Sequence, residues 1–303
     1  MQYARCASLI DLPTGLGALF AFALGACVGS FVNVVAYRHP REISIATPRS
    51  FCPHCTRPIP VWANIPLLSY IGLRGRCLMC GGTIPFRYFL TELTLAVAAA
   101  YLFLSFPPGD AFARFVFCAA LYVIALIDYD WRVIPNMITF IGVPVGVLAA
   151  WLLMPEVGLR SSLIGVAAGA GFLFLTGEVY LLVRHREGVG LGDVFLIGMV
   201  GAFLGWAGVA FTLFVGSILG SLGGIAFALS GGAAATPAEE VPAAIAEVTG
   251  VRRGAVKSAG EAHAESREPS LMGTEVPFGP FLAMAGAIYA LFQPQLTHWY
   301  LSR

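Results

Sequence analysis

Long apolar runs recur along this chain, and they constrain its fold more than any other feature. Hydrophobic residues make up 58% of the 303 residues, and charged residues make up only 12%. Several runs reach the roughly 20 residues that a helix needs to cross a bilayer. We therefore predict an all-α fold, a polytopic membrane helical bundle of about eight transmembrane helices in a lipid bilayer. The net charge of +1 argues against nucleic-acid binding, which requires a concentrated basic face.

The apolar runs divide the chain into five parts. We expect spans at residues 15–37, 88–106, 112–127, 137–154, 161–183, 194–206 and 209–229, and a last span that opens at 277–281 and ends near Phe292. The parts are a first transmembrane helix (1–37), a cytoplasmic cysteine-bearing segment (38–87), six helices that carry the active site (88–229), a low-complexity insertion (230–275) and a last helix with a C-terminal tail (276–303). The insertion is rich in Ala, Glu, Gly, Pro and Ser, so we expect it to be disordered or loosely helical. Small residues in the short sixth span should let helices pack closely.

The cysteine-bearing segment also sets the predicted orientation. Between residues 38 and 87 it holds seven arginines and a single acid, Glu42. Cytoplasmic loops of membrane proteins carry an excess of Lys and Arg, which places this segment inside and the N-terminus outside. An even number of spans then places the C-terminus outside as well.

Two C-x-x-C pairs in this segment predict a metal site. They are Cys52-Pro-His-Cys55 and Cys77-Leu-Met-Cys80, separated by 21 residues. Two such knuckles supply the four thiolates of a tetrahedral Zn²⁺ site, as in a zinc ribbon. Two disulfides are the alternative, and the reducing cytoplasm favours the metal. A closed four-sulfur site is structural, so we assign it no catalytic role and expect His54 to stay outside the ligand set.

Two acids stand at the ends of apolar runs, where an ionisable side chain suggests a functional site. Asp128 follows the third expected span, and Asp193 follows a glycine-rich turn. Alternation of the spans returns both acids to the same membrane face. Gly190 and Gly192 in the turn would let the backbone approach a substrate closely. Two paired carboxylates can share a proton, one acting as base toward water and the other as acid toward a carbonyl, so we predict an aspartyl protease.

Three other residues have local interpretations. Pro135 suits the start of a helix, because its missing N–H would be unsatisfied there anyway. Asn33 in the first span is either a helix-packing hydrogen-bond donor or a functional residue. Glu92 near the start of the second span either pairs with Arg87 or another arginine, or belongs to a binding site.

Several blocks of the sequence resemble the prepilin peptidases, the type IV leader peptidases of bacterial pilus and type II secretion systems. The blocks stand in the family's order at 29–40, 48–55, 64–69 and 74–92, in the motif Asp128-x-Asp-x-x-x-Ile-Pro-Asn, in the G-x-G-D of 190–193 and in Pro277-Phe-Gly-Pro-Phe281. The resemblance covers nearly the whole chain apart from its start and the 230–275 insertion.

The resemblance implies an integral aspartyl endopeptidase that cuts the short basic leader of type IV prepilins or type II secretion pseudopilins after a glycine. The cut would lie at the cytoplasmic face of the bacterial inner membrane. Asp128 and Asp193 are implied as the catalytic acids and Asp130 as a supporting acid. Family members with the cysteine block also methylate the new N-terminus with S-adenosylmethionine, and the sequence indicates no residues that bind this donor. The family commonly has a lysine two residues after the second aspartate, where this chain has Phe195.

Other functions compete with this interpretation. A GxGD protease of the presenilin or signal-peptide-peptidase type would use Asp130 as its first catalytic acid, but the cysteine pairs and the N-terminal block argue against it. A transporter could use Glu92, Glu178, Asp128 and Asp193 as an ion path, although its acids should lie near mid-membrane. A structural scaffold would explain the cysteines but would leave both aspartates without a purpose.

Overall fold

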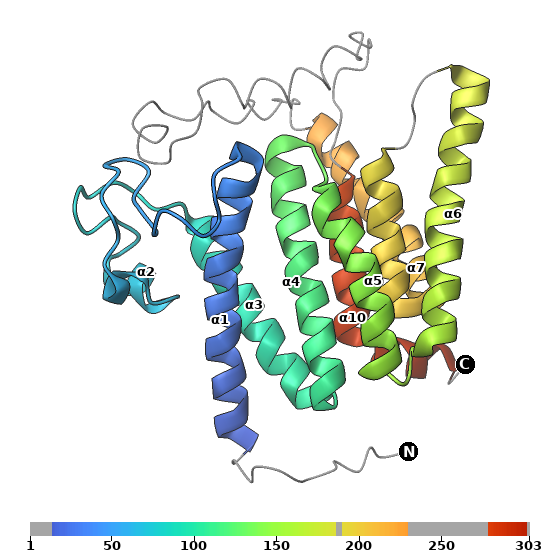
Figure 1. Cartoon of the computed structure of the whole chain (residues 1–303), viewed down its shortest axis with the longest axis horizontal. Helices are drawn as coiled ribbons and strands as arrows, with labels where there is room; N and C mark the ends of the chain where they lie inside the picture. Colours follow the sequence, from blue (N-terminus) through green and yellow to red (C-terminus); the bar gives the residue numbers. More distant parts are fainter. Residues whose placement is uncertain (1–13, 186–189, 230–277, 302–303) are drawn as a thin grey trace.

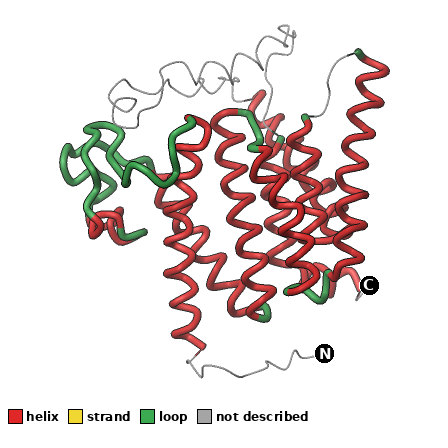
Figure 2. Tube along the Cα trace, viewed as in Figure 1, coloured by secondary structure: helices red, strands yellow, loops and turns green. Residues whose placement is uncertain are grey.

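A computed structural model of the protein describes residues 14–185, 190–229 and 278–301. These residues form helices and loops (Figure 1). Within these ranges the chain forms no β-strand, only isolated bridges. The long helices lie side by side, and a loop-rich segment lies against one edge of the bundle beside α1 (Figures 1 and 2). The predicted insertion at 230–275, the first residues of the chain and the start of the glycine turn at 188–189 lie outside the described residues.

In the part of the chain that the structure describes, seven apolar helices form the bundle. Among the described residues, five helices are long and apolar enough to cross a membrane, and α5 is a shorter apolar helix. The helices are α1 (Thr14–Arg38), α3 (Phe86–Ser105), α4 (Pro108–Trp131), α5 (Asn136–Leu152), α6 (Gly158–Arg184), α7 (Leu191–Leu229) and α10 (Gly279–Leu301). Most of these bounds lie close to the predicted spans, and α5 starts directly after Pro135 as expected. The last span is longer than predicted: the backbone departs from helical geometry at Phe292, where we expected the span to end, but α10 continues to Leu301.

Helix α7 is not one rod, because the chain reverses inside it. Gly205 has φ 70° and ψ −174°, a conformation that L side chains rarely adopt. A side chain at Gly169 of α6 would touch both Ile197 and Val209. In one straight helix those two residues would be about 18 Å apart. The limbs on either side of Gly205 correspond to the predicted sixth and seventh spans, which brings the apolar helical segments to about eight.

Small residues bring α6 and α7 into close contact, as predicted. A Cβ at Gly165 would lie only 2.6 Å from the carbonyl oxygen of Gly201. The Ser162 hydroxyl donates a hydrogen bond to the Ala202 carbonyl at 2.7 Å. In lipid, the hydrophobic effect does not drive apolar helices together. Such helices associate through close packing, which small residues allow because they let the backbones approach.

Helix α4 lies at the centre of the arrangement. It contacts α1 and α3 as well as α10. Near the start of α4, the fully buried Arg114 binds Asp110 at 2.6 Å and donates a hydrogen bond to the Ala290 carbonyl of α10 at 2.8 Å. A charge buried this deeply requires such partners, so this pair fastens α4 to α10.

The segment between α1 and α3 folds back onto both helices. It contains the short helices η1 (His39–Arg41), η2 (Val61–Asn64) and α2 (Leu68–Gly72). Arg38 at the end of α1 holds its first loop, donating to the carbonyls of Ser44 at 3.0 Å and Pro48 at 2.9 Å. Leu67 is buried in a cluster with Ala26 of α1 and Ala96 of α3. The segment is therefore packed along the side of the bundle rather than attached only by its ends.

Candidate active site

Asp128 lies in the last turn of α4 and is 5% exposed. The helix ends at Arg132, whose left-handed conformation lets its N–H bond the Asp128 carbonyl at 2.8 Å. The backbone N–H of Gly279, the first residue of α10, donates a hydrogen bond to the Asp128 carboxylate. A Cβ at Gly279 would overlap that carboxylate, so only glycine allows α10 to begin this close to it.

Asp193 lies in the first turn of α7. Its backbone N–H bonds the Gly190 carbonyl at 3.0 Å, which closes the turn of the G-x-G-D sequence. A Cβ at Gly192 would lie 2.8 Å from the Ile134 Cβ, so the turn packs tightly on the loop after α4. Asp193 Oδ1 is buried and has no hydrogen-bond partner among the described residues. A buried acceptor without a partner is rare, and it suits a group that binds something else.

The two carboxylates converge from separate helices. They are close enough to interact electrostatically. Ile134 lies between the segments that carry them: side chains at Gly192 and at Gly279 would both meet it. The structure thus brings Asp128, Asp193, Gly190 and Gly192 to one end of the bundle, as alternation of the spans predicted.

Asp130 has a different environment from Asp128. It forms a bidentate ion pair with Arg87 of α3, with N–O distances of 2.8 and 2.7 Å. Two residues along a helix correspond to about 200° of rotation, so the two acids point to opposite faces of α4. Arg87 thus pairs with Asp130 and not with Glu92. The Glu92 carboxylate instead accepts a hydrogen bond from the Leu67 N–H at 2.8 Å.

Phe195, in place of the family's common lysine, packs onto α5. Its ring meets that of Phe140 edge to face, with centroids 6.0 Å apart. The position next to the G-x-G-D turn is therefore filled by an apolar contact.

The four clustered cysteines form a compact set. Their sulfur atoms lie within 4.8 Å of one another, and all four cysteines are free thiols. Both knuckles repeat one backbone pattern: the Thr56 N–H bonds the Cys52 carbonyl at 2.8 Å, and the Gly81 N–H bonds the Cys77 carbonyl at 2.9 Å. The disulfide alternative is absent from this arrangement, and His54 is not in the cluster.

The cluster fits a tetrahedral metal ion. With Zn–S bonds of about 2.3 Å, tetrahedral geometry separates the sulfurs by about 3.8 Å. The Cys52 and Cys80 sulfurs are 3.9 Å apart. Burial raises the pKa of the Cys52 thiol to about 12, so a bound cation is needed to hold this sulfur as a thiolate at neutral pH.

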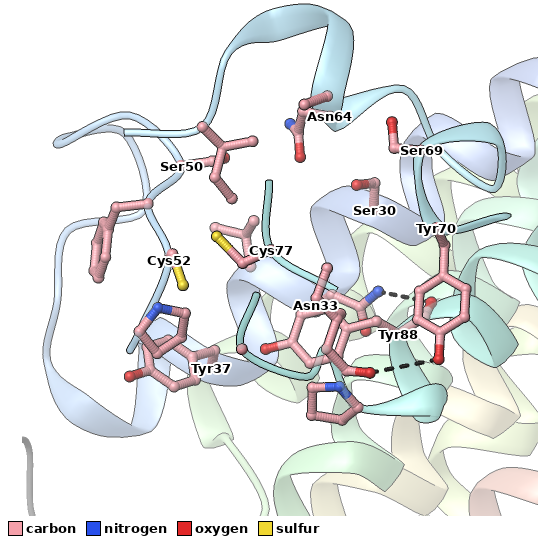
Figure 3. Close-up of a pocket in the computed structure, with 18 of the residues that line it drawn as sticks. Ser30, Asn33, Tyr37, Ser50, Cys52, Asn64, Ser69, Tyr70, Cys77 and Tyr88 are labelled. Atoms are coloured by element: carbon pink, nitrogen blue, oxygen red, sulfur yellow. Dashed lines mark hydrogen bonds between the residues drawn. The ribbon is translucent and has the colours of Figure 1, made fainter. Parts of the chain in front are cut away.

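A cavity of about 610 Å³ lies between α1, α3 and the cysteine-bearing segment (Figure 3). Asn33 lines it and is 5% exposed; its amide bonds the Tyr88 carbonyl at 3.1 Å. Glu92, Cys52, Cys77 and Asp130 also line it, whereas Asp128 and Asp193 do not. The sequence did not reveal this cavity, because its walls come from segments that no single motif contains. The Asn33 side chain makes the packing bond considered above and also faces this space.

Comparison with known proteins identifies the class. Residues 23–106 match the model of the bacterial peptidase A24 N-terminal domain, and residues 115–225 match that of the type IV leader peptidase family. The chain belongs to the type IV leader peptidase family, and with its apolar helices it is a multi-pass inner-membrane protein.

Three relatives illustrate the similarity, and each is named prepilin leader peptidase/N-methyltransferase. The protein of Burkholderia pseudomallei is 38% identical over 72% of this chain and 79% of its own length. The protein of Myxococcus xanthus is 33% identical over 95% of this chain and 94% of its own length. That of Aeromonas hydrophila is 31% identical over 98% and 99%. No solved structure matches the chain.

Proposed function

We propose that this protein removes the basic leader of type IV prepilins or type II secretion pseudopilins and then N-methylates the new N-terminus. Membership of the family and the names of its relatives support both activities. The clients would present a short basic leader, a small residue and then an apolar helix.

The convergence of Asp128 and Asp193 carries the proposal for cleavage. One acid would take a proton from water as the water attacks the scissile carbonyl, and the other would donate a proton to the carbonyl oxygen. The Gly279 N–H, bonded to the Asp128 carboxylate, would fix the orientation of that acid. The unpartnered Asp193 Oδ1 would then face the water or the substrate.

The position of the acids suits the substrate. They lie at helix ends, so a scissile bond at the membrane surface would reach them while the client's apolar helix stays in lipid. We place this end of the bundle in the cytoplasm, because the arginine-rich segment 38–87 lies at the same end. Glycine before the cut would suit a site lined by close backbone turns.

The cysteine cluster would hold a structural Zn²⁺ through Cys52, Cys55, Cys77 and Cys80. When bound, the ion would join the two knuckles into one rigid unit, and its four sulfur ligands would leave no position open for catalysis. S-adenosylmethionine would be the methyl donor, as the methyltransferase part of the relatives' names suggests.

Mass spectrometry of a mature pilin N-terminus tests both activities together. Pilin from cells that contain this protein should lack its leader and carry one methyl group on the terminal amine. Pilin from cells without it should keep the leader. Leader removal that does not depend on this protein would reject the proposal.

A further inference from the structure

We propose that residues 61–72 of the cysteine-bearing segment lie in the membrane interface, where they anchor this segment to anionic phospholipids. The stretch consists of η2, α2 and the turn between them, and it would lie in the leaflet on the side of the candidate active site. Such an anchor would be independent of both enzymatic activities. Part of a segment that we expected in the cytoplasm would thus lie at the boundary between water and lipid.

Large apolar side chains along this stretch remain exposed in the part of the chain that the structure describes. Leu68 and Ile71, three residues apart, share one face of α2, and α2 contacts η2. The exposed fractions lie between 46% and 69% for Val61, Trp62, Ile65, Leu68 and Ile71. Clustered exposure of this kind marks an interaction surface. A tryptophan beside aliphatic side chains is typical of segments at the membrane–water interface.

The stretch lies alongside the apolar helices rather than beyond their ends. A Cβ at Gly29 of α1 would meet the Glu92 backbone of α3, and the Glu92 carboxylate accepts the hydrogen bond from the Leu67 N–H at 2.8 Å. Gly29 precedes Arg38, the last residue of α1, by about 14 Å along the helix axis. Figure 1 shows α2 beside the bundle, well below the upper end of α1. Leu67 therefore lies level with the second turn of α3, a helix that can cross a membrane.

The exposed patch continues the outer surface of α3. The Tyr70 ring of α2 packs on the rings of Phe86 and Phe89 of α3, with centroids 6.4 and 5.3 Å apart. Phe86 and Leu90, which are four residues apart on α3, are themselves exposed. Lipid covers the exposed apolar side of a spanning helix. The same lipid would cover the side chains of α2 that border this surface.

The backbone of the stretch suits a medium that is poor in water, where an unsatisfied N–H is costly. Pro60 and Pro66 have no N–H to satisfy. Glu92 accepts the N–H of Leu67, in place of the arginine pairing considered from the sequence. Carbonyls within the stretch accept the N–H groups of Leu68, Ser69, Ile71 and Leu73. Glu92 thus fixes the turn between η2 and α2 against the bundle.

The charges around the patch favour anionic lipid. Arg74 and Arg76 follow α2 directly and are exposed. Between residues 43 and 91 the chain has no Asp or Glu. Arginines beside an apolar surface attract anionic headgroups. The same positive charge repels the basic leader of a prepilin, which favours lipid over the client as the partner of this patch.

Photocrosslinking of the full-length protein in liposomes tests the anchor. The liposomes contain phosphatidylcholine and phosphatidylglycerol, one of them with tritium in its acyl chains. We expect p-benzoylphenylalanine in place of Trp62, or of Leu68 in a second protein, to form as much labelled adduct as it does in place of Val97, an exposed residue of α3. In place of Ala46, exposed in the loop that Arg38 holds at the end of α1, it should form little adduct.

The arginines are tested in the same assay. Arg74→Gln combined with Arg76→Gln should abolish the preference of the adduct for phosphatidylglycerol over phosphatidylcholine. Arg49→Gln combined with Arg57→Gln removes the same charge from exposed positions elsewhere in the segment and should keep the preference. An unchanged preference in the first pair would overturn the anionic partner.

Size-exclusion chromatography selects the variants that fold, and either probe position is sufficient. The anchor is overturned if both positions form as little lipid adduct as position 46, or if they crosslink to an added prepilin in place of lipid. Lipid labelling requires neither cleavage nor methylation. A protein that forms the adduct but leaves prepilin uncut would therefore overturn the proposed function alone.

Discussion

At the C-terminal end of α4, Asp128 and Asp130 lie on opposite faces of the helix and have different surroundings. Asp128 is buried beside Asp193 and the N–H of Gly279, and no arginine in the described part of the chain forms an ion pair with it. The Asp130 side chain is 22% exposed, and both terminal nitrogens of Arg87 bind it. The motif places these acids two residues apart, yet one faces tightly packed helix ends and the other faces a loop-walled cavity. Under the proposed function, the surroundings of these acids rather than their distance in sequence would separate a catalytic acid from a supporting one.

The largest effect should come from the face that holds Asp128. We expect Asp128→Asn or Asp193→Asn to lower the rate of leader cleavage by about 10²–10⁴-fold, because each removes one partner of the acid–base pair. Cleavage of a synthetic prepilin by purified protein measures this. Glu178→Gln changes an acid on an exposed face of α6 and is the control. Normal cleavage by either aspartate variant would remove that residue from the catalytic site.

A side chain added at Gly279, against the Asp128 carboxylate, should have the next largest effect on leader cleavage. Gly279→Val would force the start of α10 away from the carboxylate, and a misplacement of about 1 Å can cost about 10²-fold in rate. Single-turnover cleavage should show this loss, while donor binding stays normal. Gly15→Val, in open space near the start of α1, is the matched control. A Gly279→Val protein with wild-type kinetics would show that the close approach does not orient the acid.

The cavity face should respond to loss of the cysteines. Cys52→Ser combined with Cys77→Ser should remove bound zinc and reduce methyl transfer by at least about tenfold, because the metal joins the two knuckles of the cysteine block that methylating family members carry. Leader cleavage should fall much less. Metal content by mass spectrometry and the masses of processed pilin measure both. Equal losses of cleavage and methylation at normal protein levels would contradict a separation of the two faces.

Loss of the Arg87–Asp130 ion pair should have the smallest effect on leader cleavage. Asp130→Asn leaves Arg87 without its carboxylate partner at a partly exposed site, where such pairs are worth up to about 1 kcal/mol. We therefore expect only a few-fold change in cleavage. Comparison with Asp128→Asn in the same assay is decisive: a larger loss with Asp130→Asn would favour the presenilin-like arrangement.

The helical architecture was predictable because apolar runs and their punctuation determine where spans begin and end. Pro135 predicted the start of α5, and the predicted boundary between the sixth and seventh spans, at residues 206–209, lies directly after the reversal at Gly205. Alternation alone brought Asp128 and Asp193 to one end. The partner of Arg87 was not predictable, because Glu92 and Asp130 are equally plausible in sequence and only the rotation of α3 against α4 decides between them. The cavity was hidden for the same reason, since its shape depends on how a loop segment packs.

The buried Arg114–Asp110 pair has a consequence far from where it sits. It fixes α10 along the axis of α4 at a point 14 residues before Asp128, about 21 Å away along the helix. A slip of α10 by a fraction of a turn there would carry Gly279 with it and loosen the hydrogen bond that aims Asp128. Under the proposed function, the orientation of a catalytic acid at one end of α4 would thus depend on a buried ion pair near the other end of the same helix.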